Sequence, residues 1–219
     1  MTTDKVHYVE LLPHEFRARI ARAPAYLPLG TVEWHGEHCA LGSDALISGG
    51  LFERAARRFG GIVLPPLFLG PDRARLEADG TLLVGMDYAD TTVPARQLDG
   101  SCYRIDEGLF LMMCEAIIAQ TTRAGFKVLV ADGHGPSRWA WARYASSWES
   151  RYGIQLISVD RDFAGAWRSQ VDHAARNETS LMLAIRPDLV DLARLPADRA
   201  IWPTGVGGED PRDSSAAYG

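Results

Sequence analysis

The stretch LPLGTVEWHGEHCALGSD, residues 27–44, decides how the rest of the chain is interpreted. It continues an apolar run that starts at residue 25, and it then places Glu33, His35, His38 and Asp44 in one polar loop before a helical pattern begins. A strand, a polar loop and a helix in this order form the repeating unit of an α/β protein. Carboxylates and imidazoles suit zinc, iron or manganese, although solvated acids and a buried histidine explain this loop alone equally well.

Composition restricts the classes of partner. The chain has 219 residues, of which 47% are hydrophobic and 23% charged, and these values are typical of one folded globular domain. A formal net charge of −5 argues against nucleic acid, since nucleic-acid binders need basic patches, so we expect a small-molecule partner. The N-terminal residues lack a signal-peptide pattern, and no apolar run is long enough for a membrane span. We therefore expect a cytoplasmic protein that has no membrane or nucleic-acid partner.

The cysteines fit a reducing compartment. Cys39, Cys102 and Cys114 are odd in number and lack CxxC spacing, so a disulfide framework is not expected. Cys39 lies inside the polar loop, but no activating base stands beside it. We interpret it as a packed thiol and not as a nucleophile.

Strand and helix patterns alternate along the chain. Strands are expected at 25–30, 61–66, 128–130 and 154–159, and helices at 13–23, 43–60, 106–124, from about residue 137 to Gly153, and at 174–185. Residues 80–98 are expected to be extended, as a hairpin or a lid. The pattern predicts a single α/β domain over residues 1–219, with three layers and a mostly parallel sheet flanked by helices. Residues 204–219 are expected to be a loop or tail, or the end of a chain that lacks a final helix.

A row of aromatic residues marks the helix before Gly153. Trp141, Tyr144, Trp148 and Tyr152 recur at spacings of three and four, which puts them on one helix face. We interpret this face as core or as a surface that contacts another subunit, in preference to a stacking platform for a ligand.

Four of the six histidines lie in three short segments. His35 and His38 belong to the first loop, His134 to DGHGP (132–136), and His173 to DHAARNETS (172–180). Each segment falls at or after the carboxyl end of an expected strand, which is the edge where α/β sheets place their sites. The three segments are therefore expected to form one site.

These three motifs resemble those of the creatininase family. The first loop is similar to the family's Glu-x-His-Gly-x-His…Asp signature, DGHGP to its Asn-Gly-His-Gly-Gly turn, and DHAARNETS to its His-Ala-Gly-x-x-Glu-Thr-Ser segment. The motifs occur in the family's order over residues 27–181, with a weaker similarity near the C-terminus. The resemblance implies an α/β fold with two divalent metal ions (Zn, Mn or Fe), and a homo-oligomer, with a hexamer suspected. Helix-borne aromatics such as Trp141 and Trp148 would supply contact surface.

The resemblance also implies a role for each site residue. Glu33 and His134 would bind one metal, His35 the other, and Asp44 would bridge both and hold a metal-bridging hydroxide. His173 would donate a proton to the leaving nitrogen or stabilise the oxyanion. Glu178 would be a metal ligand and part of the catalytic set, or alternatively an acid that caps a helix. His38 would orient a ligand through its ring nitrogen.

The implied activity is hydrolysis of a non-peptide C–N bond in a small cyclic amide or formamide. This chain departs from the family pattern at Pro136, where the family places a ligating glutamate, and at Asp132 and Ala175. Peptide processing, hydrolysis of a sugar-like ring and a non-catalytic metal or small-molecule binding role remain alternatives. Substrate contacts are expected from Gly135, Trp139 and Trp167, with Arg138 as a further candidate.

Overall fold

The structure, a computed structural model, describes residues 5–163 and 172–219. Its internal contacts divide the chain into two compact units. The sheet unit comprises Met1–Thr31, Asp44–Pro71 and Ile105–Ala166, and the loop unit comprises Val32–Ser43, Asp72–Arg104 and Trp167–Gly219. The expectation of one domain over residues 1–219 stays a prediction.

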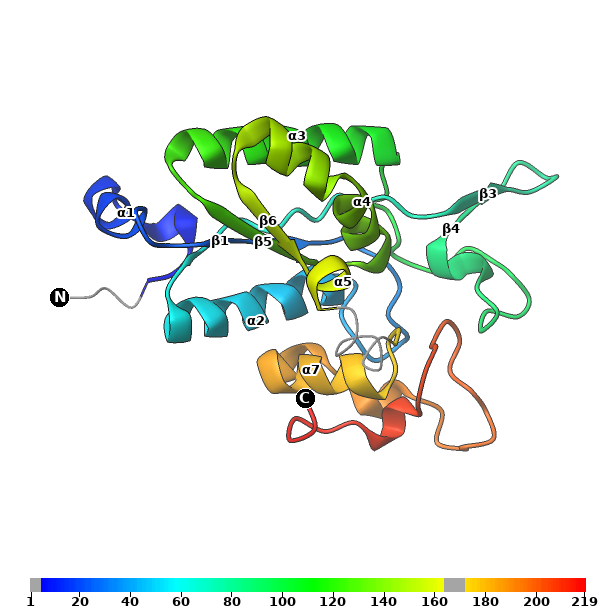
Figure 1. Ribbon diagram of the computed structural model, residues 1–219. Helices are drawn as coiled ribbons and strands as arrows, with labels where there is room; N and C mark the ends of the chain where they lie inside the picture. The colour runs from blue at the N-terminus through cyan, green and yellow to red at the C-terminus, as the bar shows by residue number, and fades with distance from the viewer. Residues whose placement is uncertain (1–4, 164–171) are drawn as a thin grey trace. The chain divides into compact units, whose positions relative to one another are not determined.

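A parallel sheet of four strands organises the sheet unit (Figure 1). The strands are β1 (Ala25–Leu29), β2 (Ile62–Val63), β5 (Val128–Gly133) and β6 (Gln155–Ser158), and their order in the sheet is β2-β1-β5-β6. All three pairings are parallel, and Leu29 at the end of β1 pairs with Gly133 at the end of β5. Gly133 has φ +147, and a Cβ there would lie 1.8 Å from the carbonyl oxygen of Leu29. Only glycine allows these two strand ends to approach so closely.

Helices cover both faces of this sheet. Helices α3 (Glu107–Ala124) and α4 (Gly135–Tyr152) lie over one face and α2 (Ser43–Phe59) lies over the other (Figure 1). The alternation of side chains along β1 explains the division, because Leu27 and Leu29 pack into the core with residues of α3 and α4, whereas Tyr26 packs against Phe52 of α2. The predicted α/β class with a parallel sheet between helical layers is confirmed.

The connections leave β1 and β5 in opposite directions. Strand β1 is followed by α2 and then by β2 on one side, and β5 is followed by α4 and then by β6 on the other side. The carboxyl ends of β1 and β5 are therefore a topological switch point, where open α/β sheets bind ligands. The shorter elements of this unit are η1 (Tyr8–Glu10), α1 (Pro13–Arg19) and α5 (Val159–Asp162).

The loop unit has little regular structure. It contains a hairpin of β3 (Ala74–Leu76) and β4 (Leu82–Val84), helix α7 (Arg176–Ile185), and the 3-10 turns η2 (Gly85–Tyr88), η4 (Pro187–Leu189), η5 (Leu192–Arg194) and η6 (Pro211–Asp213). Hydrogen bonds between distant segments hold it together. Gly205 donates its N–H to the carbonyl of Thr91, and His173 and Gly207 exchange a pair of backbone hydrogen bonds. The hairpin expected within residues 80–98 exists, but it pairs β4 with residues that precede this range.

The sequence predicted the helices of the sheet unit more closely than its strands. Strand β2 has two residues where six were expected, since Pro65 and Pro66 cannot continue a sheet ladder. Trp141 and Trp148 are 0% and 4% exposed and pack edge to face within the core of their own chain. The interpretation of this face as core is confirmed for these two residues, and the expectation that they supply contact surface to another subunit is wrong.

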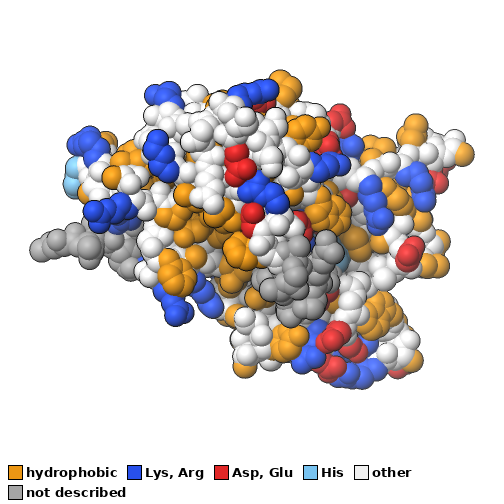
Figure 2. Space-filling model, in the orientation of Figure 1, with side chains coloured by type: hydrophobic (Ala, Val, Ile, Leu, Met, Phe, Trp, Pro, Cys, Tyr) orange, Lys and Arg blue, Asp and Glu red, His pale blue; other side chains and the backbone are white. Residues whose placement is uncertain are grey.

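Acidic and basic side chains lie next to one another on the surface of the sheet unit. Arg143 pairs with Glu107 and Arg151 with Glu115, and both pairs join α4 to α3. On the face shown in Figure 2, blue and red side chains are interspersed over this region. Among the described residues, no helix has the length and apolarity needed to cross a bilayer.

Candidate metal centre

The loop that carries Glu33 and His35 is held by hydrogen bonds inside the loop unit. The N–H of Glu33 donates to the carbonyl of Leu41 at 3.0 Å, and the N–H of Trp34 donates to the hydroxyl of Ser101 at 3.0 Å. Gly36 has φ +68, and a Cβ there would lie 2.6 Å from Nδ1 of His38. The turn therefore requires glycine, and it leaves the side chains of Glu33 and His35 buried.

His35 has one ring nitrogen fixed by the backbone. Its Nδ1 lies 3.0 Å from the carbonyl oxygen of Glu33, and because a carbonyl only accepts, Nδ1 carries the hydrogen. The other nitrogen, Nε2, lies 3.6 Å from Oε1 of Glu178. In the neutral ring this second nitrogen presents its lone pair to a carboxylate, an arrangement that a cation between them stabilises.

His173 repeats the arrangement with the nitrogens exchanged. Its Nε2 donates to the carbonyl of Trp34 at 2.8 Å, and its Nδ1 lies 3.9 Å from Oε1 of Glu33. The rings of His35 and His173 are 4.6 Å apart. One donor atom from each of Glu33, His35 and His173 lies within 4.8 Å of the others, so these three residues can hold a metal ion. His173 is therefore a candidate ligand as well as the expected proton donor.

Glu178 uses its two carboxylate oxygens differently. Oε2 accepts the N–H of Ala174 at 2.6 Å, as a helix-capping acid does, while Oε1 is the atom that faces His35. Burial alone would raise the pKa of Glu178, but the adjacent His35 and His173 and the Ala174 hydrogen bond hold it below its usual value. The two roles considered for Glu178 are thus compatible, one for each oxygen.

Asp172 fixes the start of α7. Its carboxylate accepts the N–H groups of Asn177 at 2.8 Å and Glu178 at 3.0 Å, which satisfies two donors at the helix N-terminus. Burial, with a further contribution from the charge of Glu178, raises the pKa of Asp172 to about 6. We did not predict this role for Asp172 from the sequence, although an aspartate before a helix is the signal for it.

His38 connects the first loop to α7. Its Nε2 lies 3.0 Å from the hydroxyl of Thr179, which in turn lies 3.2 Å from the carbonyl of Ala174. His38 is 2% exposed, and burial lowers its pKa to about 4, so the ring is neutral at pH 7. It contacts the residue that follows Glu178, in keeping with the supporting role expected for it. Burial also raises the pKa of the Cys39 thiol to about 12, which agrees with a packed thiol.

The sheet unit carries a third histidine of the same kind. His134 follows β5, and its Nε2 donates to the carbonyl of Pro71 at 3.2 Å. Its Nδ1 lies 3.3 Å from Oδ2 of Asp44, which occupies the first turn of α2 as expected. His134 and Asp44 therefore meet at the carboxyl edge of the sheet, where the sequence placed them.

Pro136 starts a helix where the family pattern has a ligand. Helix α4 begins at Gly135, and Pro136 is its second residue, where a missing N–H costs no helical hydrogen bond. Trp139, one of the expected substrate contacts, is 53% exposed one turn further along, and its ring lies beside Gly135. Trp167, the third expected contact, lies outside the described residues.

Arg138 is largely buried within the protein. It is 7% exposed and lies between two carboxylates, with its Nε 3.0 Å from Asp160 and its Nη1 3.7 Å from Asp132. Burial raises the pKa of Asp132 to about 6, and the charge of Arg138 opposes that rise. Of the roles considered for Arg138, these two contacts favour a structural role within the protein over contact with a substrate.

The buried neutral state of His38 predicts a dependence of stability on pH. The folded pKa of about 4 lies below the ordinary value of 6.5, so only the unfolded chain takes up this proton as the pH falls from 6.5 towards 4. Each pKa unit is worth about 1.4 kcal/mol, and the loss can therefore approach about 3 kcal/mol. In urea titrations with EDTA, the unfolding free energy of the natural chain should fall more steeply over this range than that of His38→Gln. If the unfolding free energies of the two proteins fall in parallel over this pH range, His38 is not the buried neutral group responsible.

Comparison with known proteins places these features in a family. A family model described as Creatininase, creatinine amidohydrolase, matches residues 10–94 and 97–219. A creatinine amidohydrolase of Pseudomonas putida is 28% identical over 209 residues, which cover 85% of this chain and 74% of the relative.

Solved structures agree with the fold. A crystal structure of creatinine amidohydrolase has a TM-score of 0.72 at 23% identity, and the match covers 97% of this chain and 90% of that one. A structure described as creatininase Mn has a TM-score of 0.67 at 23% identity, with 98% and 91% covered. The chain belongs to the creatininase family of amidohydrolases.

Proposed function

We propose that this chain is a two-metal hydrolase that cleaves the C–N bond of a small cyclic amide or formamide. The observation that carries the proposal is shared by His35, His134 and His173. In each, the N–H of one ring nitrogen donates a hydrogen bond to a backbone carbonyl, and the other ring nitrogen faces a carboxylate. Histidines that bind metals are commonly oriented in this way, because the backbone contact fixes the tautomer that leaves a lone pair for the ion.

The donor set fits divalent zinc, manganese or iron. We propose that the ions are held by Glu33, His35, Asp44, His134 and Glu178, with the assignment to each ion that the family resemblance implies. Nitrogen and carboxylate donors in this ratio are borderline ligands of the kind that these metals prefer. When bound, such ions lower the pKa of water and polarise a carbonyl group.

The protein's own side chains would transfer protons and exclude solvent. His173 is not among the proposed ligands, and its Nε2 donates to the Trp34 carbonyl, so Nδ1 would accept a proton from the attacking water and then give it to the leaving nitrogen. Asp172 fixes the first turn of α7 and thereby the position of Glu178. Glu33 and His35 are almost fully buried, and the low local dielectric strengthens the electrostatic interactions around them.

Pro136 favours a second candidate function. A chain that lacks the ligating glutamate at this position could retain one ion and bind a small molecule without hydrolysing it. We also propose a homo-oligomer, on the resemblance alone, since the core position of Trp141 and Trp148 removes the interface we first expected.

Hydrolysis is tested directly with a panel of small lactams and formamides. We expect the purified chain to release an amine from at least one member of the panel. Excess chelator should reduce the rate at least tenfold, and zinc, manganese or iron should restore it, because the ions supply most of the activation of water. Amine release detected by fluorescamine measures the rate. Metal binding without turnover on any compound would instead support the binding function.

Metal stoichiometry distinguishes Glu178 from its nearest alternative, Glu37. Glu178→Gln should lower the metal content from about two ions to about one per chain, because a neutral amide is a poor replacement for a carboxylate that faces His35. Glu37→Gln is the matched control, since Glu37 is exposed and should leave the content at two. Inductively coupled plasma mass spectrometry measures both variants. If Glu178→Gln keeps two tightly bound ions, Glu178 is a capping acid only.

A further inference from the structure

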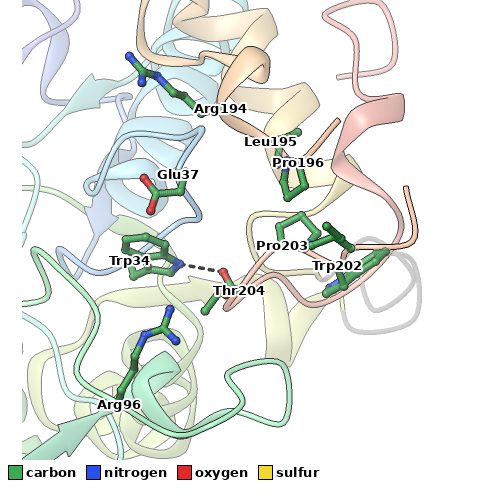
Figure 3. Close-up of a pocket in the computed structure, with 10 residues that line it drawn as sticks. Trp34, Glu37, Arg96, Arg194, Leu195, Pro196, Trp202, Pro203 and Thr204 are labelled. Atoms are coloured by element: carbon green, nitrogen blue, oxygen red, sulfur yellow. Dashed lines mark hydrogen bonds between the residues drawn. The ribbon is translucent and has the colours of Figure 1, made fainter. Parts of the chain in front are cut away.

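A cavity lies entirely within the loop unit, and its lining includes Trp34 from the loop that carries Glu33 and His35. It has a volume of about 170 Å³, and Figure 3 shows its lining. The side chain of Trp34 forms one wall, whereas its sequence neighbours Glu33 and His35 face His173 and Glu178. The cavity is therefore separate from the candidate metal ligands Glu33, His35 and Glu178, although one loop contributes to both.

Two indole rings form rigid walls of this cavity. Nε1 of Trp34 donates to the carbonyl of Thr204 at 3.0 Å, and Nε1 of Trp202 donates to the carbonyl of Val206 at 2.7 Å. Each indole has thereby used its only polar atom, and what it presents to the cavity is its aromatic surface. Leu195, Pro196 and Pro203 extend this apolar lining. Trp202 is 42% exposed, so solutes can reach the rim.

The charge in this cavity comes from opposite sides of Trp34. Glu37 and Arg96 lie on the two sides of its ring, and the guanidinium of Arg96 extends towards it (Figure 3). Within residues 5–163 and 172–219, neither side chain forms an ion pair. Arg194 also belongs to the lining, but its guanidinium points away and pairs with Asp191 at 3.1 Å. The cavity therefore presents one cation and one anion whose charges the described chain leaves unmatched.

We propose that this cavity binds a small zwitterion. Its carboxylate would pair with Arg96, its organic cation would lie against Glu37 and the indole of Trp34, and its short hydrocarbon segment would rest on the apolar wall. The volume limits the ligand to a few carbon atoms, since a cavity of about 150 Å³ accommodates benzene and drug-sized ligands need roughly 300 Å³ or more.

Such a ligand also has a place in the proposed reaction. When water opens a cyclic amide, its hydroxyl adds to the carbonyl carbon, the C–N bond breaks and the proton goes to nitrogen. One molecule then carries a carboxylate and an amine. The binding site itself does not rest on the proposed function, because its charges and walls are present whether or not the chain hydrolyses anything.

Calorimetric titration at low ionic strength tests the site with three matched probes: 4-aminobutyrate, butyrate and butylamine. The natural chain should bind 4-aminobutyrate about fivefold more tightly than either singly charged probe, since each exposed ion pair contributes little but adds to the other. Arg96→Gln should weaken the binding of 4-aminobutyrate and of butyrate about fivefold and leave the binding of butylamine unchanged. Glu37→Gln should weaken the binding of 4-aminobutyrate and of butylamine and leave the binding of butyrate unchanged. Arg194→Gln is the matched control and should bind all three probes as the natural chain does.

Two outcomes of this titration overturn the proposal, and a repeat with chelator provides a third. The first is the absence of 4-aminobutyrate binding at millimolar concentration, and the second is binding that neither Arg96→Gln nor Glu37→Gln changes. The titration is repeated with chelator present. If chelation removes the affinity for 4-aminobutyrate, the probe binds at the candidate metal ligands Glu33, His35 and Glu178. That result overturns the cavity assignment but leaves the proposed hydrolysis intact. Affinity that survives in a chain without hydrolytic activity supports the cavity and contradicts only the proposed function.

Discussion

A histidine nitrogen that faces a carboxylate is the constraint on which the site of this protein depends. In His35, His134 and His173 a backbone carbonyl accepts a hydrogen bond from one ring nitrogen. The lone pair of the other ring nitrogen then faces Glu178, Asp44 and Glu33, respectively. A lone pair and a carboxylate repel each other unless a proton or a metal ion lies between them. Burial strengthens that repulsion, because little water is present to screen it. The arrangement is therefore built for a positive charge, which a proton or a metal ion can supply.

The two units meet this constraint by different means. In the sheet unit the parallel ladder fixes the strand ends, and His134 follows β5 directly with its N–H bonded to the carbonyl of Leu29. Among the described residues of the loop unit, no such ladder surrounds Glu33, His35 and His173, and polar contacts between distant segments hold them in place. Ser101 holds the N–H of Trp34, the carbonyl of Trp34 holds His173, and Asp172 holds the first turn of α7. Each of these bonds is modest alone, so the geometry depends on their number.

The sequence predicted the parts of the structure that local pattern controls. The helix from Glu107 to Ala124 and the strand after Pro24 follow from apolar periodicity and from proline and glycine punctuation. The segments that carry His35 and His134 follow β1 and β5 as expected, whereas α5 lies between β6 and the segment that carries His173. Trp141 and Trp148 show the limit of this reasoning, because helical spacing defines a face but not whether another subunit or the chain's own core covers it.

Contacts between segments far apart in the chain could not be predicted. The cavity beside Trp34 combines residues near positions 34, 96 and 202, and no local pattern relates them. Arg138 looked available as a cation in sequence, yet Asp160 occupies its guanidinium from a turn more than twenty residues away. Even where the ligand residue types were evident, the choice of nitrogen that each ring turns inward depended on which carbonyl lay nearby.

The central claim is that the carboxylate-facing nitrogens bind metal ions, and anomalous X-ray scattering from crystals grown with manganese tests it most directly. We expect one anomalous peak within about 2.0–2.3 Å of Nε2 of His35, and another at the same distance from Nδ1 of His134. Ordered manganese bound elsewhere on the chain, or the absence of any anomalous peak at these nitrogens, would contradict it.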